Sequence, residues 1–372
     1  MRGERDLRVC FLPGALNTGG VARNTARLAS EFVRNGYRVD YFLTYKSGQL
    51  IETIPESCRV FSGNTSAKMS LFAMIRYLKT AKPDAVISAR DYLNILAFVA
   101  ILLTRADTIH IATLRTASFA RGRAKASLYQ RAVSRIATVV YGRTDHVVAV
   151  SKAVAYHETL ERRLPEGLIK VIYNPVAESG LIARERSRPN PSREVANVCA
   201  VGRLVEQKDF ETFLKVVCEL SKRRPVRARI VGDGPLKDEL VATAERLGIS
   251  SCVVFTGALD SAIPEIANAD VLIQTSLWEG LPTVLIEALA VGTNVVATNA
   301  PGGAAEILEN GKYGWLVPCK AVDSIAEAVT DALENSLEPN FLKARASVFS
   351  PEAAFEQYAH LINARNVRTQ SG

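Results

Sequence analysis

Short runs of β-branched and apolar residues alternate along the chain with longer segments whose apolar residues recur at helical spacing. This alternation is typical of parallel sheets whose strands are joined by crossover helices. The predicted strands fall into two series, and the second series starts near Ala196. The first series comprises LRVCFLPG, YRVDYFLT, DAVISAR, TIHIATLR and DHVVAVS, and the second comprises ANVCAVGRL, VRARIVGDG, CVVFTG, VLIQTS, NVVATNA and GWLVP.

The segment between the two series, residues 178–194, is polar and has no apolar period, which is typical of a linker. With 372 residues, the chain is long enough for two hydrophobic cores. We therefore expect an α/β fold with two doubly wound, Rossmann-like domains, at residues 1–180 and 190–348. Apolar residues at helical spacing after Phe349 predict a final helix within residues 349–372. Ligands bind at the carboxyl ends of such strands, so two facing domains predict a site in a central cleft.

The segment WEGLPTVLIEALAVG, residues 278–292, places one glutamate before a predicted helix and a second within it. Proline is favoured in a first helical turn, so Pro282 puts Glu279 beside the free amides of the helix start. That positive end favours an anion, and the carboxylates of Glu279 and Glu287 accept hydrogen bonds from hydroxyls. The pair therefore suits a nucleotide sugar, whose hydroxyl-bearing groups flank a diphosphate. The alternative is that Glu279 only supports the helix dipole and Glu287 is a solvated helix residue.

Further candidate residues follow the first strand of each series. Gly19 and Gly20 follow the first strand of the chain and would let backbone amides approach a ligand closely. Arg203 and Lys208 follow the first strand of the second series, where two cations can neutralise a diphosphate. Because ligands bind at the carboxyl ends of parallel strands, we expect all four residues to face the ligand.

The order and the residue sequences of these segments resemble those of the retaining glycosyltransferases of family four. The resemblance covers nearly the whole chain, is densest over residues 173–318, and includes Glu279 and Glu287 as the E-x7-E signature. It implies the GT-B fold, in which an acceptor-binding domain and a nucleotide-sugar-binding domain face a central cleft. It also implies a C-terminal helix that crosses back to the N-terminal domain. The matching segments are YNPV, VGRLVEQKDF, VGDGPL, FTG, WEGLPTVLIEALAVGTNVVAT, GGAAEIL and GKYGWLVP.

The same resemblance implies roles for individual residues. Glu279 is expected to contact the transferred sugar, and Glu287 is expected to hold the ribose of the nucleotide. Arg203 and Lys208 should bind the diphosphate, so the expected catalytic residues are Glu279, Arg203 and Lys208. The other expected donor-binding residues are Gly19, Gly20, Gly280, Leu281, Pro282, Thr283 and Val284.

The expected reaction uses no metal. The sequence holds no acidic metal-binding cluster, so Arg203, Lys208 and the helix dipole would stabilise the negative charge left on the diphosphate. We therefore expect no cofactor besides the nucleotide sugar as co-substrate. Retention in the family is generally discussed as front-face attack, in which the departing phosphate takes the acceptor proton, and no catalytic nucleophile is assigned.

One departure from the family pattern concerns the end of a strand in the first domain. Many relatives carry a histidine near the sugar at this point, whereas this chain reads ATLRTASF, which places Arg115 and Thr116 there. Arg115 or Thr116 is the candidate contact for the sugar or the acceptor. His110 lies earlier in the strand and is interpreted as a core residue.

Charge is divided unevenly along the chain. Residues 1–185 hold 27 Lys and Arg against 15 Asp and Glu, a net +12, whereas residues 186–372 hold 19 against 23, a net −4. From Thr108 to Thr144 there is no acid, and apolar residues interleave with the basic ones as in a helix lying on anionic lipid. A solvated helix is the alternative, and no recognisable module supports binding to nucleic acid. The candidate membrane contacts are Arg121, Lys125, Arg131 and Arg135.

Cysteine spacing and hydropathy bear on the compartment. The six cysteines have no zinc or redox spacing, which favours a reducing cytoplasm. No long apolar segment precedes the first predicted strand, so a secretory signal is not expected. The apolar run from Leu93 to Thr104 is too short to span a bilayer and predicts a buried helix. We expect a cytoplasmic protein bound peripherally to the inner face of the cell membrane.

Three functional classes remain open at this point. The leading expectation is a glycosyltransferase that moves a hexose or N-acetylhexosamine from a nucleotide sugar to a polyprenyl-linked saccharide or other glycan in surface polysaccharide synthesis. We expect a UDP-linked donor, and a GDP-linked sugar is the alternative because it uses the same frame. A nucleotide-sugar epimerase shares the two-domain architecture, and a binding protein without turnover would share the fold. The sequence does not predict the oligomeric state.

Overall fold

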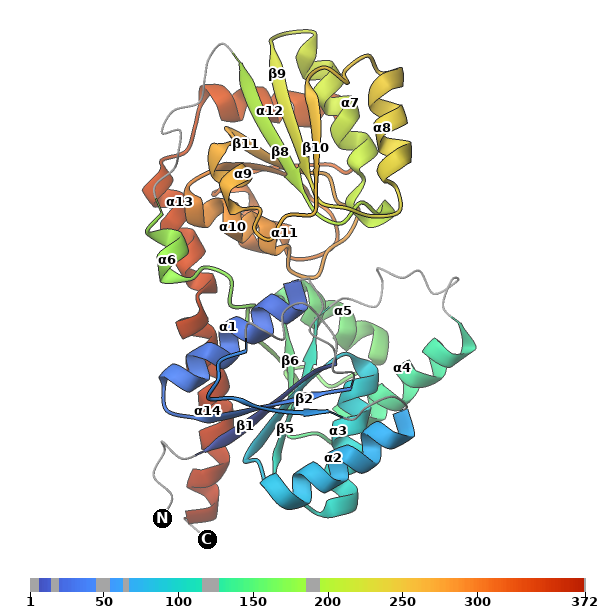
Figure 1. Ribbon diagram of the computed structural model, residues 1–372, viewed down its shortest axis with the longest axis vertical. Helices are drawn as coiled ribbons and strands as arrows, with labels where there is room; N and C mark the ends of the chain where they lie inside the picture. The colour runs from blue at the N-terminus through green and yellow to red at the C-terminus, as the bar shows by residue number, and fades with distance from the viewer. Residues whose placement is uncertain are drawn as a thin grey trace. The chain divides into compact units, whose positions relative to one another are not determined.

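The computed structural model describes residues 7–14, 20–44, 54–62, 67–115, 127–184 and 195–370. The chain divides into two compact units (Figure 1). Unit 1 comprises Met1–Pro175 together with Pro351–Gly372, and unit 2 comprises Val176–Ser350. The division therefore falls at Pro175, within a few residues of the position expected from the polar linker.

The described part of unit 1 contains a seven-stranded parallel sheet in the order β3-β2-β1-β4-β5-β6-β7. The order reverses between β1 and β4, which is the switch point of a doubly wound sheet. The strands are β1 (Arg8–Gly14), β2 (Arg38–Leu43), β3 (Arg59–Ser62), β4 (Ala85–Ala89), β5 (Ile109–Leu114), β6 (His146–Ala149) and β7 (Ile169–Val171).

Alternate side chains of β1 enter two separate cores, because successive residues of a strand point to opposite faces. Val9 and Phe11 pack with residues of α1 and α14, whereas Cys10 and Leu12 pack with residues of α2 and α3. Both faces of the sheet are therefore covered, as the nearly unbroken apolar run of this strand predicts. The helices of unit 1 are α1 (Gly20–Arg34), α2 (Ala67–Ala81), α3 (Asp91–Thr104), α4 (Leu128–Tyr141), α5 (Lys152–Arg162) and α14 (Pro351–Gln370).

The C-terminal helix α14 belongs to unit 1, which confirms the expected return of the chain. Phe355 of α14 meets Phe32 of α1 edge to face, with ring centroids 4.9 Å apart. Its ring lies 5.7 Å from that of Tyr37, which itself packs against Phe32 at 5.0 Å. This aromatic cluster ties the last helix of the chain to the first one.

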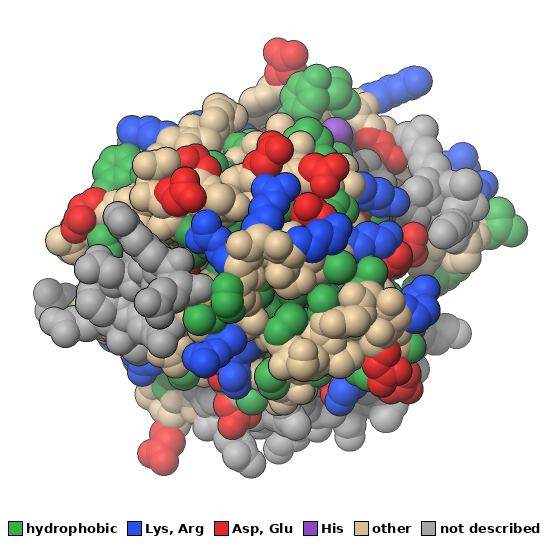
Figure 2. All heavy atoms as spheres, turned by 90° about the horizontal axis from the view of Figure 1, so that it is seen from above, with side chains coloured by type: hydrophobic (Ala, Val, Ile, Leu, Met, Phe, Trp, Pro, Cys, Tyr) green, Lys and Arg blue, Asp and Glu red, His purple; other side chains and the backbone are tan. Residues whose placement is uncertain are grey.

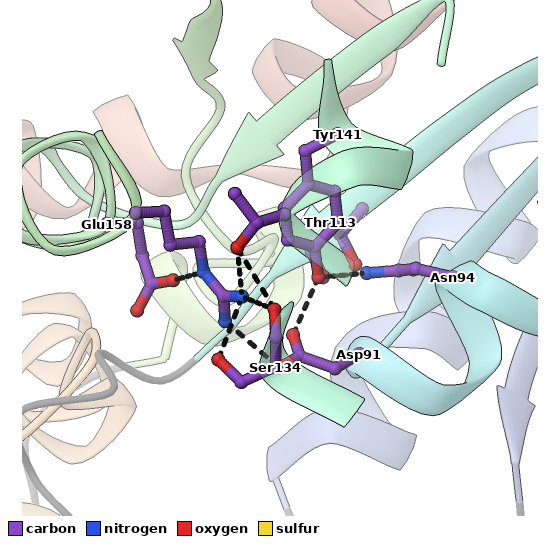
Figure 3. Close-up of polar contacts among 8 residues, drawn as sticks. Asp91, Asn94, Thr113, Ser134, Tyr141 and Glu158 are labelled. Atoms are coloured by element: carbon purple, nitrogen blue, oxygen red, sulfur yellow. Dashed lines mark hydrogen bonds and ion pairs between the residues drawn. The ribbon is translucent and has the colours of Figure 1, made fainter. Parts of the chain in front are cut away.

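A buried polar network joins α3, α4 and α5 (Figure 3). Arg162 donates from Nε to Glu158 at 2.5 Å and from Nη2 to Asp91 at 2.9 Å. Tyr141 donates its hydroxyl to Asp91 at 2.6 Å and accepts a hydrogen bond from Asn94 at 3.0 Å. Burial alone would lower the pKa of Arg162, but the charges of Glu158 and Asp91 outweigh burial and raise it. The three helices are therefore held together by a buried, satisfied charge cluster.

His110 lies inside β5 and is a core residue, as interpreted from the sequence. Its ring nitrogens lie 2.8 Å from Ser88 Oγ and 2.7 Å from Thr144 Oγ1, and burial lowers its pKa to about 3. The apolar run at Leu93 forms most of α3, which is buried along one side while Leu102 and Leu103 are exposed. Within the described residues, no helix has the length and apolar character needed to cross a membrane.

The described part of unit 2 repeats the architecture with a six-stranded parallel sheet in the order β10-β9-β8-β11-β12-β13. Its switch point lies between β8 and β11. The strands are β8 (Ala196–Val201), β9 (Val226–Val231), β10 (Val253–Gly257), β11 (Val271–Gln274), β12 (Asn294–Thr298) and β13 (Trp315–Val317). The helices are α6 (Ser179–Ile182), α7 (Phe210–Ser221), α8 (Lys237–Arg246), α9 (Ile263–Asn268), α10 (Thr283–Val291), α11 (Ala304–Ile307), α12 (Val322–Glu334) and α13 (Pro339–Ala346), with 3-10 turns η5 (Glu206–Lys208), η6 (Glu309–Gly311) and η7 (Ser347–Phe349).

We predict that Phe355→Ala lowers the free energy of unfolding of unit 1 and leaves that of unit 2 unchanged. The reason is that the ring of Phe355 packs against Phe32 and Tyr37, which both belong to unit 1. The expected loss is about 2 kcal/mol, below the range for a fully buried phenylalanine because Phe355 is partly exposed. Both tryptophans, Trp278 and Trp315, lie in unit 2, so their fluorescence follows the unfolding of unit 2. Circular dichroism follows the unfolding of both units.

The matched control is Glu356→Ala, which removes an exposed side chain from the same helix. If the unfolding transition of unit 1, followed by circular dichroism, were the same in Phe355→Ala and in the wild type, the structural role of this cluster would be contradicted.

Candidate functional site

The predicted site in unit 2 centres on the buried carboxylate of Glu279. Lys208 Nζ, at the end of η5, lies 2.5 Å from Glu279 Oε1. The same oxygen accepts a hydrogen bond from Ser276 Oγ at 2.8 Å and a longer one from Gln274 Nε2 at 3.4 Å. Gln207 Nε2 lies 3.4 Å from the other carboxylate oxygen. One acid is therefore held by a cation and three neutral donors, which fixes its orientation.

The loops that follow β8 and β11, at the switch point of the sheet, are joined by hydrogen bonds. The turn after β8 meets the loop after β11 through Gln207, whose carbonyl accepts from Leu277 N and whose side chain donates to the Trp278 carbonyl, both at 2.8 Å. Thr275 Oγ1 donates to the carbonyls of Lys208 and Asp209, each at 2.9 Å. The position of Glu279 is thus set by backbone contacts as well as by its own side chain.

A third loop, after β12, closes against Glu279 through glycine. Gly302 has φ of +135°, and a β-carbon there would lie 2.1 Å from the Glu279 carbonyl oxygen. Glu279 N donates to the Pro301 carbonyl, and Gly303 N donates to the Gly280 carbonyl, both at 3.0 Å. Only glycine allows this approach, so Gly302 supports the site without a side chain of its own.

Helix α10 begins directly after the loop that follows β11 and carries Glu279. Pro282 is its N-cap residue and offers no side-chain cap, so the amides at Thr283 and Val284 are not occupied by a capping side chain. Such amides and the helix dipole form an anion-binding end. The helix is apolar and mostly buried, and Glu287 is its single charged residue. Glu287 is partly exposed.

The structure brings the predicted residues Arg203, Lys208, Glu279 and Glu287 to the loops and helix that follow β8 and β11. Arg203 is exposed at the end of β8, whereas Lys208 is mostly buried against Glu279. The remaining predicted residues of this unit form the entry to α10, with Gly280, Leu281 and Pro282 buried and Thr283 and Val284 in its first turn.

The predicted residues of unit 1 have mixed outcomes. Gly20 begins α1 and is exposed, while Gly19, Thr116, Arg121 and Lys125 lie outside the described residues. Arg115 is described and points its guanidinium into the interior of unit 1. Arg131 and Arg135 are exposed on α4.

Sequence reasoning missed three neutral donors around Glu279, namely Gln207, Gln274 and Ser276. Gln207 lies within the VGRLVEQKDF segment, and Gln274 ends β11, so their place at strand ends was the available signal. In the part of the chain that the structure describes, no three His, Cys, Asp or Glu residues are grouped as metal ligands.

We predict that Gly302→Ala weakens binding of UDP, the nucleotide expected from the sequence, because the new β-carbon would displace the backbone at Glu279 and with it the entry to α10, where the diphosphate is expected. Displacement of site groups by about 1 Å can cost about 100-fold in function. Titration calorimetry with UDP measures the effect.

Gly311→Ala is the matched control, since Gly311 also has a positive φ, +105°, but nothing lies within 4 Å of its β-carbon position. Equal loss of UDP affinity in both variants would show that backbone strain, and not the contact with Glu279, is responsible.

Known proteins resemble the chain over both units. A family model described as glycosyl transferases group 1 matches residues 183–348, and one described as glycosyltransferase family 4 matches residues 18–179. A lipopolysaccharide core biosynthesis glycosyltransferase, LpsE of Rhizobium meliloti, is 30% identical over 199 residues, 52% of this chain. The chain spans only 57% of the length of LpsE.

A second relative matches over most of both chains. It is a Campylobacter jejuni α-1,4-N-acetyl-D-galactosaminyltransferase named for the acceptor GalNAc-α-(1→4)-GalNAc-α-(1→3)-diNAcBac-PP-undecaprenol, with 27% identity over 338 residues and 87% of each chain covered. Among solved structures, HepE of Anabaena in complex with UDP superposes with a TM-score of 0.80. The superposition covers 96% of this chain and all of HepE at 23% identity, so it bears on the fold.

The glycosyltransferase family 4 model matches most of the first part of unit 1, the group 1 model matches most of unit 2, and the superposition on HepE covers 96% of this chain. Glu279 and Glu287, the E-x7-E pair, lie in the region that the group 1 model matches, the first just before α10 and the second within it. This chain therefore belongs to glycosyltransferase family four and has the GT-B fold.

Proposed function

We propose that this glycosyltransferase moves a hexose or N-acetylhexosamine from a UDP-linked sugar to a polyprenyl-linked saccharide, with retention and without a metal. The observation that carries the donor site is the cluster of Lys208, Glu279 and the open start of α10 at one switch point. HepE, of the same fold, binds UDP, and the Campylobacter jejuni relative is named for a lipid-linked acceptor.

The proposed donor pose follows the charges of unit 2. The diphosphate lies at the amides of Thr283 and Val284, where the helix dipole and the exposed Arg203 favour negative charge. Glu287, further along α10, accepts hydrogen bonds from the ribose hydroxyls. Glu279 faces the transferred sugar from the loop before the helix.

Because Lys208 is paired with Glu279, this ion pair must open before Lys208 can bind the donor diphosphate. Lys208 reaches the diphosphate by leaving Glu279, which keeps its hydrogen bonds from Ser276 and Gln274. Binding of the donor thus exchanges one anion for another at Lys208 and frees Glu279 to accept from a sugar hydroxyl. This exchange is favourable because a diphosphate carries more negative charge than one carboxylate.

The chemical step breaks the bond between the anomeric carbon and the diphosphate oxygen. The electron pair leaves with the diphosphate, whose new charge is stabilised by Arg203, Lys208 and the amides of α10. The acceptor hydroxyl attacks from the same face, a new bond forms to the anomeric carbon, and the departing phosphate oxygen takes the hydroxyl proton. The metal-independent route uses cations already present in the chain.

The acceptor is proposed to lie at an anionic membrane that unit 1 contacts through α4. Leu128 and Tyr129 are 83% and 72% exposed at its start, and Ile136 is exposed two turns later. Arg131 and Arg135 are exposed between them. Apolar and basic side chains share one solvent-facing stripe, the pattern of helices that lie in a lipid interface.

Basic and acidic side chains are mixed on one face of the protein. In the view of Figure 2, basic and acidic side chains are interspersed over the same face. In contrast, the segment around α4 carries no acid from Thr108 to Thr144. The capping box of Ser127 and Gln130 and the bonds from Arg162 to Ser134 hold α4 in place. We therefore propose a peripheral location on the inner face of the cell membrane.

The function is tested by incubating the purified protein with a panel of nucleotide sugars, with and without membrane lipid extract. A glycosylated lipid formed only in the presence of extract is the expected product. A changed nucleotide sugar formed without an acceptor would indicate an epimerase, and binding without any product would indicate a protein that lacks turnover.

We predict that Glu287→Ala and Glu279→Gln have different effects. Glu287→Ala should weaken UDP binding about tenfold or more, because hydrogen bonds to a charged group contribute about 1.5–3 kcal/mol. Glu279→Gln should leave UDP affinity near that of the wild type and chiefly lower kcat. Calorimetry and initial rates separate the two effects, and Glu327→Ala, an exposed acid on α12, is the control. Wild-type behaviour of both variants would refute the site assignment.

We predict that replacing Arg121, Lys125, Arg131 and Arg135 with glutamine abolishes sedimentation with anionic vesicles. Each basic residue near such a surface contributes about 1 kcal/mol, so the four contribute about 4 kcal/mol at most. Wild-type binding should fall as salt is raised, because salt screens exposed charges. UDP affinity should not change, since none of the four residues is among the expected donor contacts. Equal sedimentation of variant and wild type would rule out this surface as the membrane contact.

A further inference from the structure

The interior of unit 1 contains an arginine whose hydrogen-bonding capacity is largely unused. Arg115 follows β5, and its Nε and Nη1 are buried without a hydrogen-bond partner. Its one described contact is a long one, 3.4 Å from Nη2 to Thr25 Oγ1 of α1. A guanidinium stays charged in proteins, and a buried charge is costly unless a partner satisfies it.

The charges around Arg115 do not supply that partner. Burial lowers the pKa of Arg115, Tyr358 of α14 raises it, and the positive charge of Arg90 lowers it further. Among the described residues, neither Arg90 nor Arg115 forms an ion pair with a carboxylate. In the sequence, residues 116–126, which directly follow Arg115, contain no Asp or Glu.

Neighbouring residues supply further signs of a ligand. Asn24, which precedes Thr25 on α1, has a buried side-chain oxygen without a hydrogen-bond partner. Arg90 connects β4 to α3 with φ of +83°, a conformation that costs energy for any residue except glycine. Arg90 and Arg115 follow β4 and β5, at the edge of a doubly wound sheet where ligands bind.

We propose that Arg115, with Arg90, binds a phosphate group of the acceptor inside unit 1, while Asn24 accepts a hydrogen bond from an adjoining sugar hydroxyl. The inference rests on the proposed function and adds the recognition of its acceptor: the ligand is a sugar joined to a diphosphate. Arginine suits such a group because its fork of N–H donors matches two phosphate oxygens. The excess of +12 in residues 1–185 is then partly a device for an anionic acceptor.

The anion has two possible sources, the acceptor diphosphate and the donor diphosphate, and binding measurements on the full chain separate them. Farnesyl diphosphate represents the acceptor anion, UDP represents the donor, and farnesol lacks the anion. Arg115→Met should weaken farnesyl diphosphate binding at least about tenfold, since it removes charge-assisted hydrogen bonds. It should leave UDP affinity and the weak affinity for farnesol unchanged.

Control variants keep the test decisive. Arg76→Met removes an exposed positive charge from α2 of the same unit and should change none of the three affinities. Arg115→Lys keeps the charge but loses the fork, so its affinity for farnesyl diphosphate should fall between wild type and Arg115→Met. If Arg115→Met does not fold, Arg115→Lys and Arg90→Met carry the test, and each should show a selective loss of farnesyl diphosphate binding.

Two outcomes would overturn the proposal. Loss of UDP affinity with retained farnesyl diphosphate binding would assign the anion to the donor. A lower melting temperature with unchanged affinity for both diphosphates would make Arg115 a structural residue. Because the readout is binding, failure of the proposed transfer reaction would appear separately, as absence of product with intact farnesyl diphosphate binding.

Discussion

The candidate site depends on the contact between two loops whose central residues, Lys208 and Glu279, are 71 positions apart in the chain. Gln207, Lys208 and Thr275 join these loops through backbone and side-chain hydrogen bonds. The start of α10 follows directly from the second loop, so its amides keep their place relative to Arg203 only while this contact holds. The doubly wound sheet provides the frame, because β8 and β11 are hydrogen-bonded neighbours. Preorganisation of this kind reduces the cost of ordering a site when a ligand binds.

The sequence predicted the six strands of the second sheet and five of the seven strands of the first, but not β3 and β7. It also predicted that Arg203, Lys208 and Glu279 gather at strand ends of unit 2. Hydrophobic periodicity located both strand series, and turn chemistry at strand ends identified Arg203, Lys208 and Glu279. The ion pair between Lys208 and Glu279 was not predictable, because both were assigned to a ligand and no pattern reports a contact across 71 residues. The same limit hid Gln207 and Gln274, whose amides have no motif of their own.

Buried charge is handled in two opposite ways within unit 1. Arg162 is surrounded by Glu158, Asp91 and hydroxyl groups, and its network packs three helices together. Arg115 is equally enclosed but has one long hydrogen bond. Residue type and hydropathy do not distinguish the two positions in the sequence, since only tertiary neighbours decide whether a buried charge is compensated. The compensated charge of Arg162 holds three helices together, whereas the uncompensated charge of Arg115 is the basis of the phosphate site that we propose.

Helix α14 gives the chain an unusual order of completion. Unit 2 is one continuous segment, Val176–Ser350, inserted between the two parts of unit 1. During synthesis from the N-terminus, all of unit 2 is made before the helix that covers Phe32 and Tyr37. Unit 2 can therefore fold on the ribosome while unit 1 still exposes an aromatic surface, the kind of surface that chaperones recognise and that aggregates. A nascent chain that stops short of Pro351 would be left with a finished unit 2 and an unfinished unit 1.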